Sequence, residues 1–127
     1  MSIKFKSVAR QNPQDQTLPA KYYAQAIRSG LTDLDELAKL IGDGSTVRQA
    51  DVYAVLIGLV NAITKELSNG RAVKLGKLGT FSVSVKSEGS DTPEEVTSSN
   101  IKSSRMLYRP STELKDMLKV LKYEKAS

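Results

Sequence analysis

Cysteine, histidine and tryptophan are all absent from this 127-residue chain. Without cysteine, the protein forms no disulfide and offers no thiolate to a metal ion. Without histidine, it lacks the commonest general base of enzymes, the Ser-His and Cys-His nucleophile pairs, and the usual zinc ligands. The remaining carboxylates, lysines and tyrosines form no pattern typical of a reaction. We therefore expect a protein that is not an enzyme and that needs no metal or other cofactor.

Long hydrophobic runs are missing as well. The N-terminal sequence MSIKFKSVAR lacks the apolar stretch of a signal peptide, and no segment approaches the roughly 20 apolar residues that cross a bilayer. These absences predict a cytoplasmic protein without membrane contact. Hydrophobic residues make up 39% of the chain and aromatic residues 6%, which suits a modest core that a dimer would enlarge.

The net charge of +5 is distributed unevenly along the chain. Residues 1–30 contain five basic and one acidic residue, whereas residues 31–70 contain three basic and six acidic residues. Residues 71–112 contain seven basic and four acidic residues, and residues 113–127 contain four basic and three acidic residues. This distribution predicts attraction of a polyanion to the basic parts, although an ordinary solvated basic surface explains it equally well.

Residues 73–85, VKLGKLGTFSVSV, predict two short strands joined by a turn between Gly76 and Gly79. Apolar side chains recur at every second position, which is the period of a strand with one buried face. Polar side chains occupy the positions between them, so the other face is free to meet solvent or a polyanion. The apolar positions are Val73, Leu75, Phe81, Val83 and Val85, and the polar positions are Lys74, Ser82, Ser84 and Lys86.

Two helices are predicted before these strands. The first is expected to start at a capping-box variant of Thr32 with Asp35 and to be stopped by Gly42 and Gly44. The second is expected to start at a capping box of Thr46 with Gln49 and to end at Asn69-Gly70. The apolar stripe of the second helix is wider than one short neighbouring helix covers, so we expect a partner chain. This stripe consists of Val52, Leu56, Leu59, Ile63 and Leu67, flanked by Val55 and Val60.

The two ends of the chain and the polar segment 87–100 complete the expected order of elements. Residues 3–8 alternate as a short strand does, and residues 21–28 favour a second strand over a short helix. Residues 87–100 are polar and acidic and predict a projecting arm, after which residues 101–109 predict another strand. A last amphipathic helix is expected to begin at Pro110-Ser111 and to continue as far as Lys125.

Two segments of the chain resemble the HU and integration host factor family of bacterial histone-like DNA-binding proteins. VKLGKLGTFSV is similar to the family's V-x-L-x-G-F-G-T-F-x-V, with Lys77 in place of the first glycine and Leu78 in place of the phenylalanine. MLYRPSTELKDML is similar to P-x-F-x-x-G-x-x-L-K-x-x-V, with Tyr108 at the aromatic position. The resemblance covers residues 31–121, and the preceding segment resembles the N-terminal extension of a Bacteroidetes subgroup.

The resemblance implies an α+β, HU-like fold with a helical dimerisation base, a three-stranded antiparallel sheet, a protruding β-arm and an N-terminal β extension. Residues 1–30 are then the extension, expected as a β-hairpin, and residues 31–127 are the HU-like DNA-binding domain with its arm at about 86–102. The implied partner is double-stranded DNA, which a nucleoid-associated homodimer bends or compacts through the minor groove, largely independently of sequence. No small-molecule substrate is implied. The alternative is an HU-fold scaffold or protein-interaction module with weakened DNA binding.

The basic residues on the strands and arm bases are the DNA-binding positions that the resemblance implies, as phosphate contacts without base readout. Pro93 lies within about one residue of the proline that the family inserts between base pairs as a wedge. Its neighbours Asp91, Glu94 and Glu95 would repel phosphates, so a plain turn proline is the other interpretation. The six DNA-binding candidates are Lys74, Lys77, Lys86, Lys102, Arg105 and Arg109.

Overall fold

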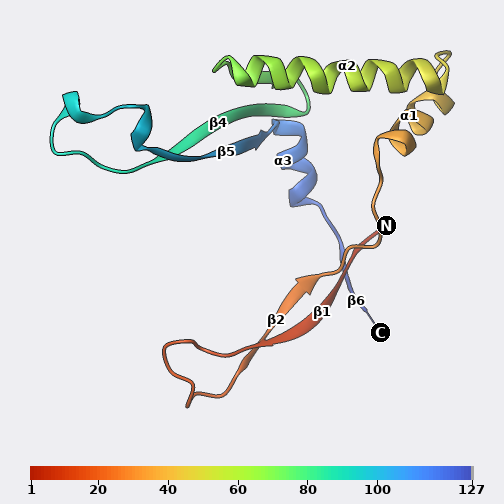
Figure 1. The fold of residues 1–127 in the computed structure, drawn as a ribbon. Coiled ribbons are helices and arrows are strands. Elements are labelled where there is room, and N and C mark those ends of the chain that lie inside the picture. The colour runs from red at the N-terminus through yellow and green to blue at the C-terminus, as the bar shows by residue number, and fades with distance from the viewer. Residues whose placement is uncertain (127) are drawn as a thin grey trace. The chain divides into compact units, whose positions relative to one another are not determined.

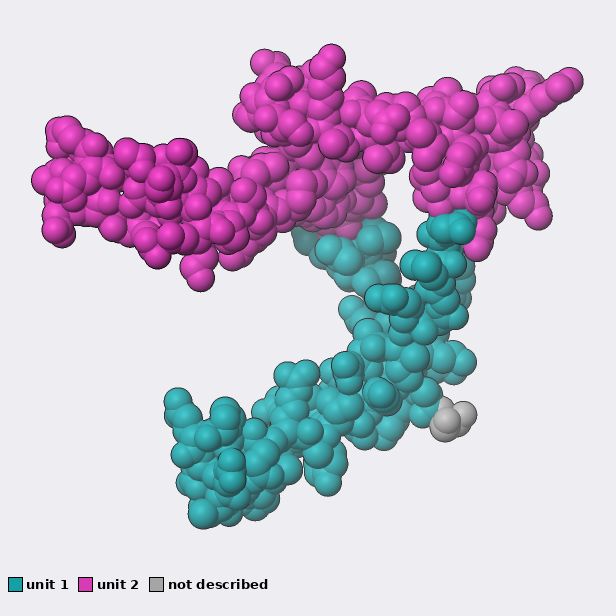
Figure 2. Space-filling view, in the orientation of Figure 1, with its two compact units in different colours: residues 1–33, 117–127 teal, residues 34–116 magenta. Residues whose placement is uncertain are grey.

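The computed structural model describes residues 1–126 as a mixed α+β chain with two small sheets (Figure 1). The chain divides into two compact units, coloured separately in Figure 2. Unit 1 comprises residues 1–33 together with the described residues from 117 onward, and unit 2 comprises residues 34–116. The elements are β1 (Ile3–Arg10), β2 (Lys21–Ala26), α1 (Leu34–Asp43), α2 (Gln49–Ser68), β3 (Val73–Leu75), β4 (Gly79–Ser87), the short 3₁₀ helices η1 (Pro93–Glu95) and η2 (Ser98–Asn100), β5 (Ile101–Pro110), α3 (Thr112–Lys119) and β6 (Tyr123–Lys125).

The two helices predicted from the apolar stripes form in unit 2 close to the expected bounds. Helix α2 ends in a Schellman turn, in which Gly70 adopts φ 81° and its N–H donates to the carbonyl of Leu67 at 3.0 Å. The N–H of Arg71 donates to the carbonyl of Glu66 at 3.1 Å, and an ion pair at 3.2 Å joins the two side chains. This turn leads the chain directly into β3.

The sheet of unit 2 has the strand order β3-β4-β5 and is antiparallel throughout. Phe81 of β4 is paired with Val73 of β3 on one side and with Tyr108 of β5 on the other. The rings of Phe81 and Tyr108 lie with their centroids 5.0 Å apart. The alternation predicted for residues 73–85 therefore places one continuous apolar row across all three strands.

The sheet of unit 1 joins the two ends of the chain. Strand β1 pairs antiparallel with β2 and parallel with β6, so the sheet order is β2-β1-β6. The expectation that the last helix continues to Lys125 is wrong, because α3 ends at Lys119. The N–H of Ile3 donates to the carbonyl of Lys122 at 2.8 Å, and that of Ala126 to the carbonyl of Phe5 at 2.9 Å. Pairing with the open edge of β1 thus outweighs the helical pattern, since one short amphipathic helix has little stability of its own.

Very little apolar surface is buried within one copy of the chain. Ala38 and Val52 are the only hydrophobic side chains classed as buried among residues 1–126. Leu40 on α1 remains 64% exposed and Val55 on α2 remains 70% exposed. No helix in the described part of the chain is long and apolar enough to span a bilayer.

Gly79 at the start of the central strand β4 tests how tightly β4 packs against β5. Its φ of 136° is one that L side chains rarely adopt, and a Cβ there would collide with the carbonyl oxygen of Arg109. Gly79→Ala is expected to lower the free energy of unfolding by at least the roughly 1–3 kcal/mol that such backbone strain costs. Denaturant unfolding at fixed protein concentration measures this change. Gly89→Ala is the control, since open space surrounds Gly89; equal midpoints for the two variants would contradict this account.

Candidate nucleic-acid interface

One face of the β3-β4-β5 sheet carries a row of basic side chains. Residues paired across neighbouring strands lie on the same face. The register pairs Lys74 with Thr80 and Thr80 with Arg109, which puts two cations and a hydroxyl side by side across the three strands. Further along the same face, Arg105 is paired with Ser84. The final pair of this face is Lys86 with Ser103.

The opposite face of this sheet is apolar and faces α2. A groove of about 610 Å³ is lined by Ile63 and Leu67 of α2 together with Phe81 and Val83 of β4 and Met106 of β5. Because side chains alternate along a strand, covering this face with α2 leaves the basic residues on the other. We call the uncovered set Lys74, Lys86, Arg105 and Arg109 the sheet basic face.

Lys77, another of the six candidates, lies in the turn between β3 and β4 rather than on the sheet basic face. Its Nζ lies 3.7 Å from Oε1 of Glu113, and its side chain is 85% exposed. An ion pair so exposed is weak and leaves the lysine available to a stronger anion. Its backbone is held more firmly, because the carbonyl of Lys77 accepts a hydrogen bond from Oγ of Ser111.

Lys102, the remaining candidate, lies at an irregularity in the pairing of β4 and β5. Lys86 is opposite Ser103 and Ser87 is opposite Ile101, so Lys102 has no direct cross-strand partner. Its Nζ lies 3.3 Å from Oε2 of Glu88. The structure therefore places four of the six candidates on one face of the sheet, whereas Lys77 and Lys102 lie outside that face, each beside an acid.

A basic hollow of about 410 Å³ lies where this sheet meets the start of α3. Ser111 caps the helix, since its Oγ accepts from the N–H of Leu114 at 3.3 Å, and the positive end of the helix dipole adds to the local field. Lys115 lines the hollow but was not among the six candidates, although its Leu-Lys pair was part of the resemblance. Three of the six also line it: Lys74, Lys77 and Arg109.

The end of the arm, residues 88–100, is formed by two short 3₁₀ turns. Pro93 begins the first, and its carbonyl accepts a hydrogen bond from the N–H of Val96 at 3.3 Å. Asn100 closes the second and donates from Nδ2 to the carbonyl of Glu88 at 3.2 Å and to Oγ of Ser90 at 2.9 Å. The whole segment contains four acids and no lysine or arginine. The chemistry of its surface is thus opposite to that of the sheet basic face.

No group of three or more acidic side chains within residues 1–126 is arranged to hold a metal ion. The site consists instead of cations and hydroxyls on a sheet, which are groups that bind phosphate oxygens.

Within residues 1–126, the arrangement of three α-helices and two small sheets is similar to the HU-like fold. The HU protein of Anabaena, crystallised with DNA, has a similar fold, with a TM-score of 0.53 and 16% identity over 68% of this chain and 96% of that one. The family described as "HU domain fused to wHTH, Ig, or Glycine-rich motif" matches residues 1–125. The chain therefore belongs to this family, and the HU-like resemblance seen in the sequence is confirmed.

A second similar structure extends over nearly the whole chain. It is a crystal structure of a bacterial protein from Bacteroides vulgatus, described as a candidate for DNA binding, with a TM-score of 0.68 and 13% identity. The match covers 98% of this chain but 48% of that one, so this chain spans about half the length of that relative. No curated protein was found to match.

Proposed function

We propose that this chain binds double-stranded DNA through the phosphate backbone, largely independently of base sequence, and bends or compacts it as a homodimer. The observation that carries the proposal is the sheet basic face, in which four cations share the side of the sheet that α2 leaves uncovered. Such a protein would act on the nucleoid in the cytoplasm, with DNA rather than a small molecule as its partner.

The chemistry of the sheet basic face suits phosphates better than base edges. Within residues 1–126, none of its four cations forms an ion pair with a carboxylate, so their charge is available to a ligand. The hydroxyls of Thr80, Ser82 and Ser84 lie between them on the same face and can donate to phosphate oxygens. Each lysine or arginine that neutralises a phosphate releases counterions, which makes binding weaker as salt increases.

The exposed apolar side chains of the helices support the homodimer. A monomeric soluble protein rarely leaves side chains such as Val55 and Leu40 exposed together with most of its other large hydrophobic residues. A second copy of the chain would cover them, and it would supply the core that one copy lacks.

A scaffold or protein-interaction module is the second candidate function. The acidic arm end favours it, because Asp91, Glu94 and Glu95 would repel the phosphates that an arm encloses. The two functions differ in their response to loss of the sheet basic face: DNA binding requires it, whereas a scaffold keeps its complexes without it.

Arg105→Gln with Arg109→Gln tests the sheet basic face directly. The pair of substitutions is expected to lower the slope of log K against log salt by about 2, at about 0.9 per lost phosphate contact, with equal effect on duplexes of different sequence. Fluorescence anisotropy across a salt series measures this slope. Lys77→Gln with Lys102→Gln is expected to have a smaller effect, because each of these lysines already has a carboxylate beside it.

Lys39→Gln with Lys65→Gln is the matched control for that experiment. It removes the same charge from helices α1 and α2, away from the sheet basic face. Failure of the unsubstituted protein to bind duplex DNA at low salt would overturn the proposal, as would equal loss of slope in the control.

Val55→Lys tests the homodimer. The unsubstituted protein is expected to sediment at twice the 13.9 kDa of one chain and to unfold at a temperature that rises with protein concentration. A lysine at Val55 would bury a charge in the partner contact and should shift the population towards monomer. Asn61→Lys adds the same charge to the same helix at a position that is already polar. A monomeric mass for the unsubstituted protein at micromolar concentration would contradict the proposal.

Pro93→Ala distinguishes the wedge from the turn proline at the arm end. We favour the turn, because Pro93 begins η1 and is flanked by acids, so the bend angle of bound DNA is expected to stay unchanged. Fluorescence energy transfer between the ends of a labelled duplex measures the bend, and Thr92→Ala is the control in the same turn. A smaller bend for Pro93→Ala alone, with an unchanged salt slope, would instead identify Pro93 as the wedge.

A further inference from the structure

Unit 1 accounts for the entire net charge of the protein. Residues 1–33 and 117–127 contain eight Lys or Arg and three acids, whereas residues 34–116 contain eleven of each. The HU-like sheet and its arm therefore belong to a unit that is neutral overall. The net attraction for a polyanion comes from the sheet that joins the two ends of the chain.

The cations of the β1–β2 pair lie on one side of that sheet. Lys4, Lys6 and Arg10 are two or four residues apart along β1, so their side chains point to the same face. The register pairs Arg10 with Lys21 of β2, which adds a fourth cation to this face. All four are exposed, and we call them the terminal basic face.

The other side of the β1–β2 pair carries no charged side chain. It presents Ile3 and Phe5 of β1, both half-buried, with Ala26 opposite Phe5 and Ala24 opposite Ser7 on β2. The third strand, β6, sets Glu124 beside Lys4 and Lys125 beside Phe5, so it adds one charge to each side of the sheet. Within the β1–β2 pair, the four cations all lie on one side, which they share with Val8 and Tyr23.

The pairing of Arg10 with Lys21 is unfavourable in the protein alone. Two like charges directly opposite each other on neighbouring strands repel and destabilise the pair. The carboxylate nearest in sequence is Asp15, whose Oδ1 accepts hydrogen bonds from the hydroxyl and the N–H of Thr17; these lower its pKa. Among residues 1–126, no carboxylate forms an ion pair with any member of the terminal basic face.

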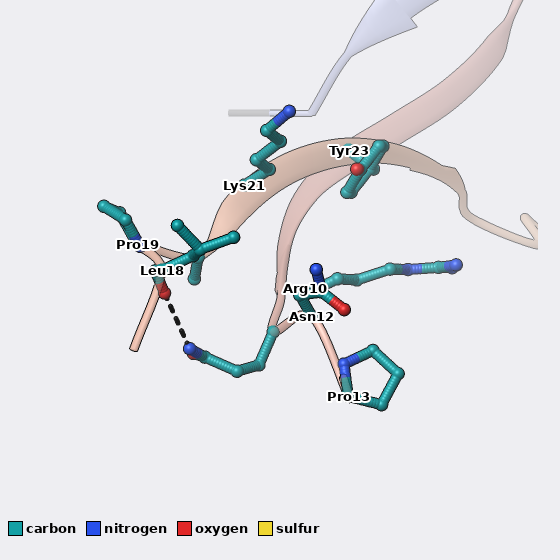
Figure 3. A pocket seen from close by; sticks show the side chains of 9 residues that line it. Arg10, Asn12, Pro13, Leu18, Pro19, Lys21 and Tyr23 are labelled. Atoms are coloured by element: carbon teal, nitrogen blue, oxygen red, sulfur yellow. Dashed lines mark hydrogen bonds between the residues drawn. The ribbon is translucent and has the colours of Figure 1, made fainter. Parts of the chain in front are cut away.

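The hairpin end forms a hollow of about 810 Å³ beside this charged pair (Figure 3). The guanidinium of Arg10 lies 5.7 Å from the ring centroid of Tyr23, an arrangement that steadies the long side chain. The loop below it is ordered by Gln11, whose Nε2 donates to the carbonyls of Gln16 at 2.9 Å and Leu18 at 2.8 Å. The cations are thus carried on a strand pair with a structured end.

We propose that the terminal basic face is a second DNA-binding surface, which holds the phosphate backbone of duplex DNA. It rests on the DNA binding proposed above and assigns a share of that binding to residues outside the HU-like sheet. From Lys4 to Arg10, the row extends about 20 Å at roughly 3.4 Å per residue, a length over which one DNA strand presents about six phosphates. A phosphate bound by either side chain would offset part of the unfavourable pairing of Arg10 with Lys21.

A double variant, Lys6→Gln with Arg10→Gln, removes two cations of this face. A fourfold variant, which also carries Lys4→Gln and Lys21→Gln, removes all four. We expect the slope of log K against log salt to fall by about 2 and about 4, with the affinity at low salt falling roughly tenfold or more for the double variant. Lys122→Gln with Lys125→Gln is the matched control, since it takes the same charge from unit 1 outside the terminal basic face. The control should keep both slope and affinity to within about twofold.

A second measurement uses the unsubstituted protein and so avoids any effect on folding. Amine-reactive labelling followed by mass spectrometry should show Lys4, Lys6 and Lys21 protected by a 30-base-pair duplex, with Lys122 labelled as in free protein. In the absence of DNA, the fourfold variant should have an unfolding temperature no lower than that of the unsubstituted protein, because the like-charge pair of Arg10 and Lys21 is gone.

The outcomes separate this inference from the proposed function. The second surface is overturned, and the proposed function stands, if only the Arg105 and Arg109 variant lowers the salt slope. In that case the variants of the terminal basic face keep the slope, and its lysines are not protected by DNA. Failure of the unsubstituted protein to bind DNA at low salt would overturn both. Reduced slope and protected lysines would support the second surface.

Discussion

The packing of helix α2 against one face of the β3-β4-β5 sheet determines the chemistry of the other face. Ile63 and Leu67 lie across a groove from Phe81, Val83 and Met106. Side chains alternate along each strand, so this apolar contact leaves Lys74, Lys86, Arg105 and Arg109 on the face that points away from the helix. The groove is incompletely filled by one chain, and the wider apolar surface of the helices is left exposed. The same contact therefore accounts for the basic face and leaves apolar side chains of the helices exposed.

Charge is organised differently in the two units, and this difference bears on function. Unit 2 has the HU-like fold yet is electrically neutral overall, because the acids of its helices and arm offset the cations of its strands. The field of such a neutral unit is local and depends on how its cations are aligned. Unit 1 has an excess of positive charge without belonging to the HU-like sheet. The net positive charge and the HU-like sheet thus lie in different parts of one chain.

Most elements could be predicted from periodicity, because each is a local pattern of apolar and polar residues. The alternation through Phe81 and the apolar stripe that ends at Leu67 both gave elements close to the observed bounds. The candidate site could be predicted only in part. The residue types were visible, but the ion pairs of Lys77 with Glu113 and of Lys102 with Glu88 join residues 36 and 14 positions apart. Lys115 enters the basic hollow only because Ser111 starts α3 beside the β3–β4 turn.

The sequence by itself determined the class of this protein: it excluded the usual catalytic and metal-binding residues, specified the strand and helix periods, and carried the motifs of the HU-like family. The hairpins of residues 1–30 and 73–85 were expected from the sequence, and the tertiary structure decided the pairing of β1 with β6 and the strand registers. The β1–β6 pairing replaces the end of the expected last helix with a strand, and the β1–β2 register sets Arg10 opposite Lys21. The reason is physical: a strand's hydrogen-bond partners come from distant parts of the chain, so no local pattern contains them.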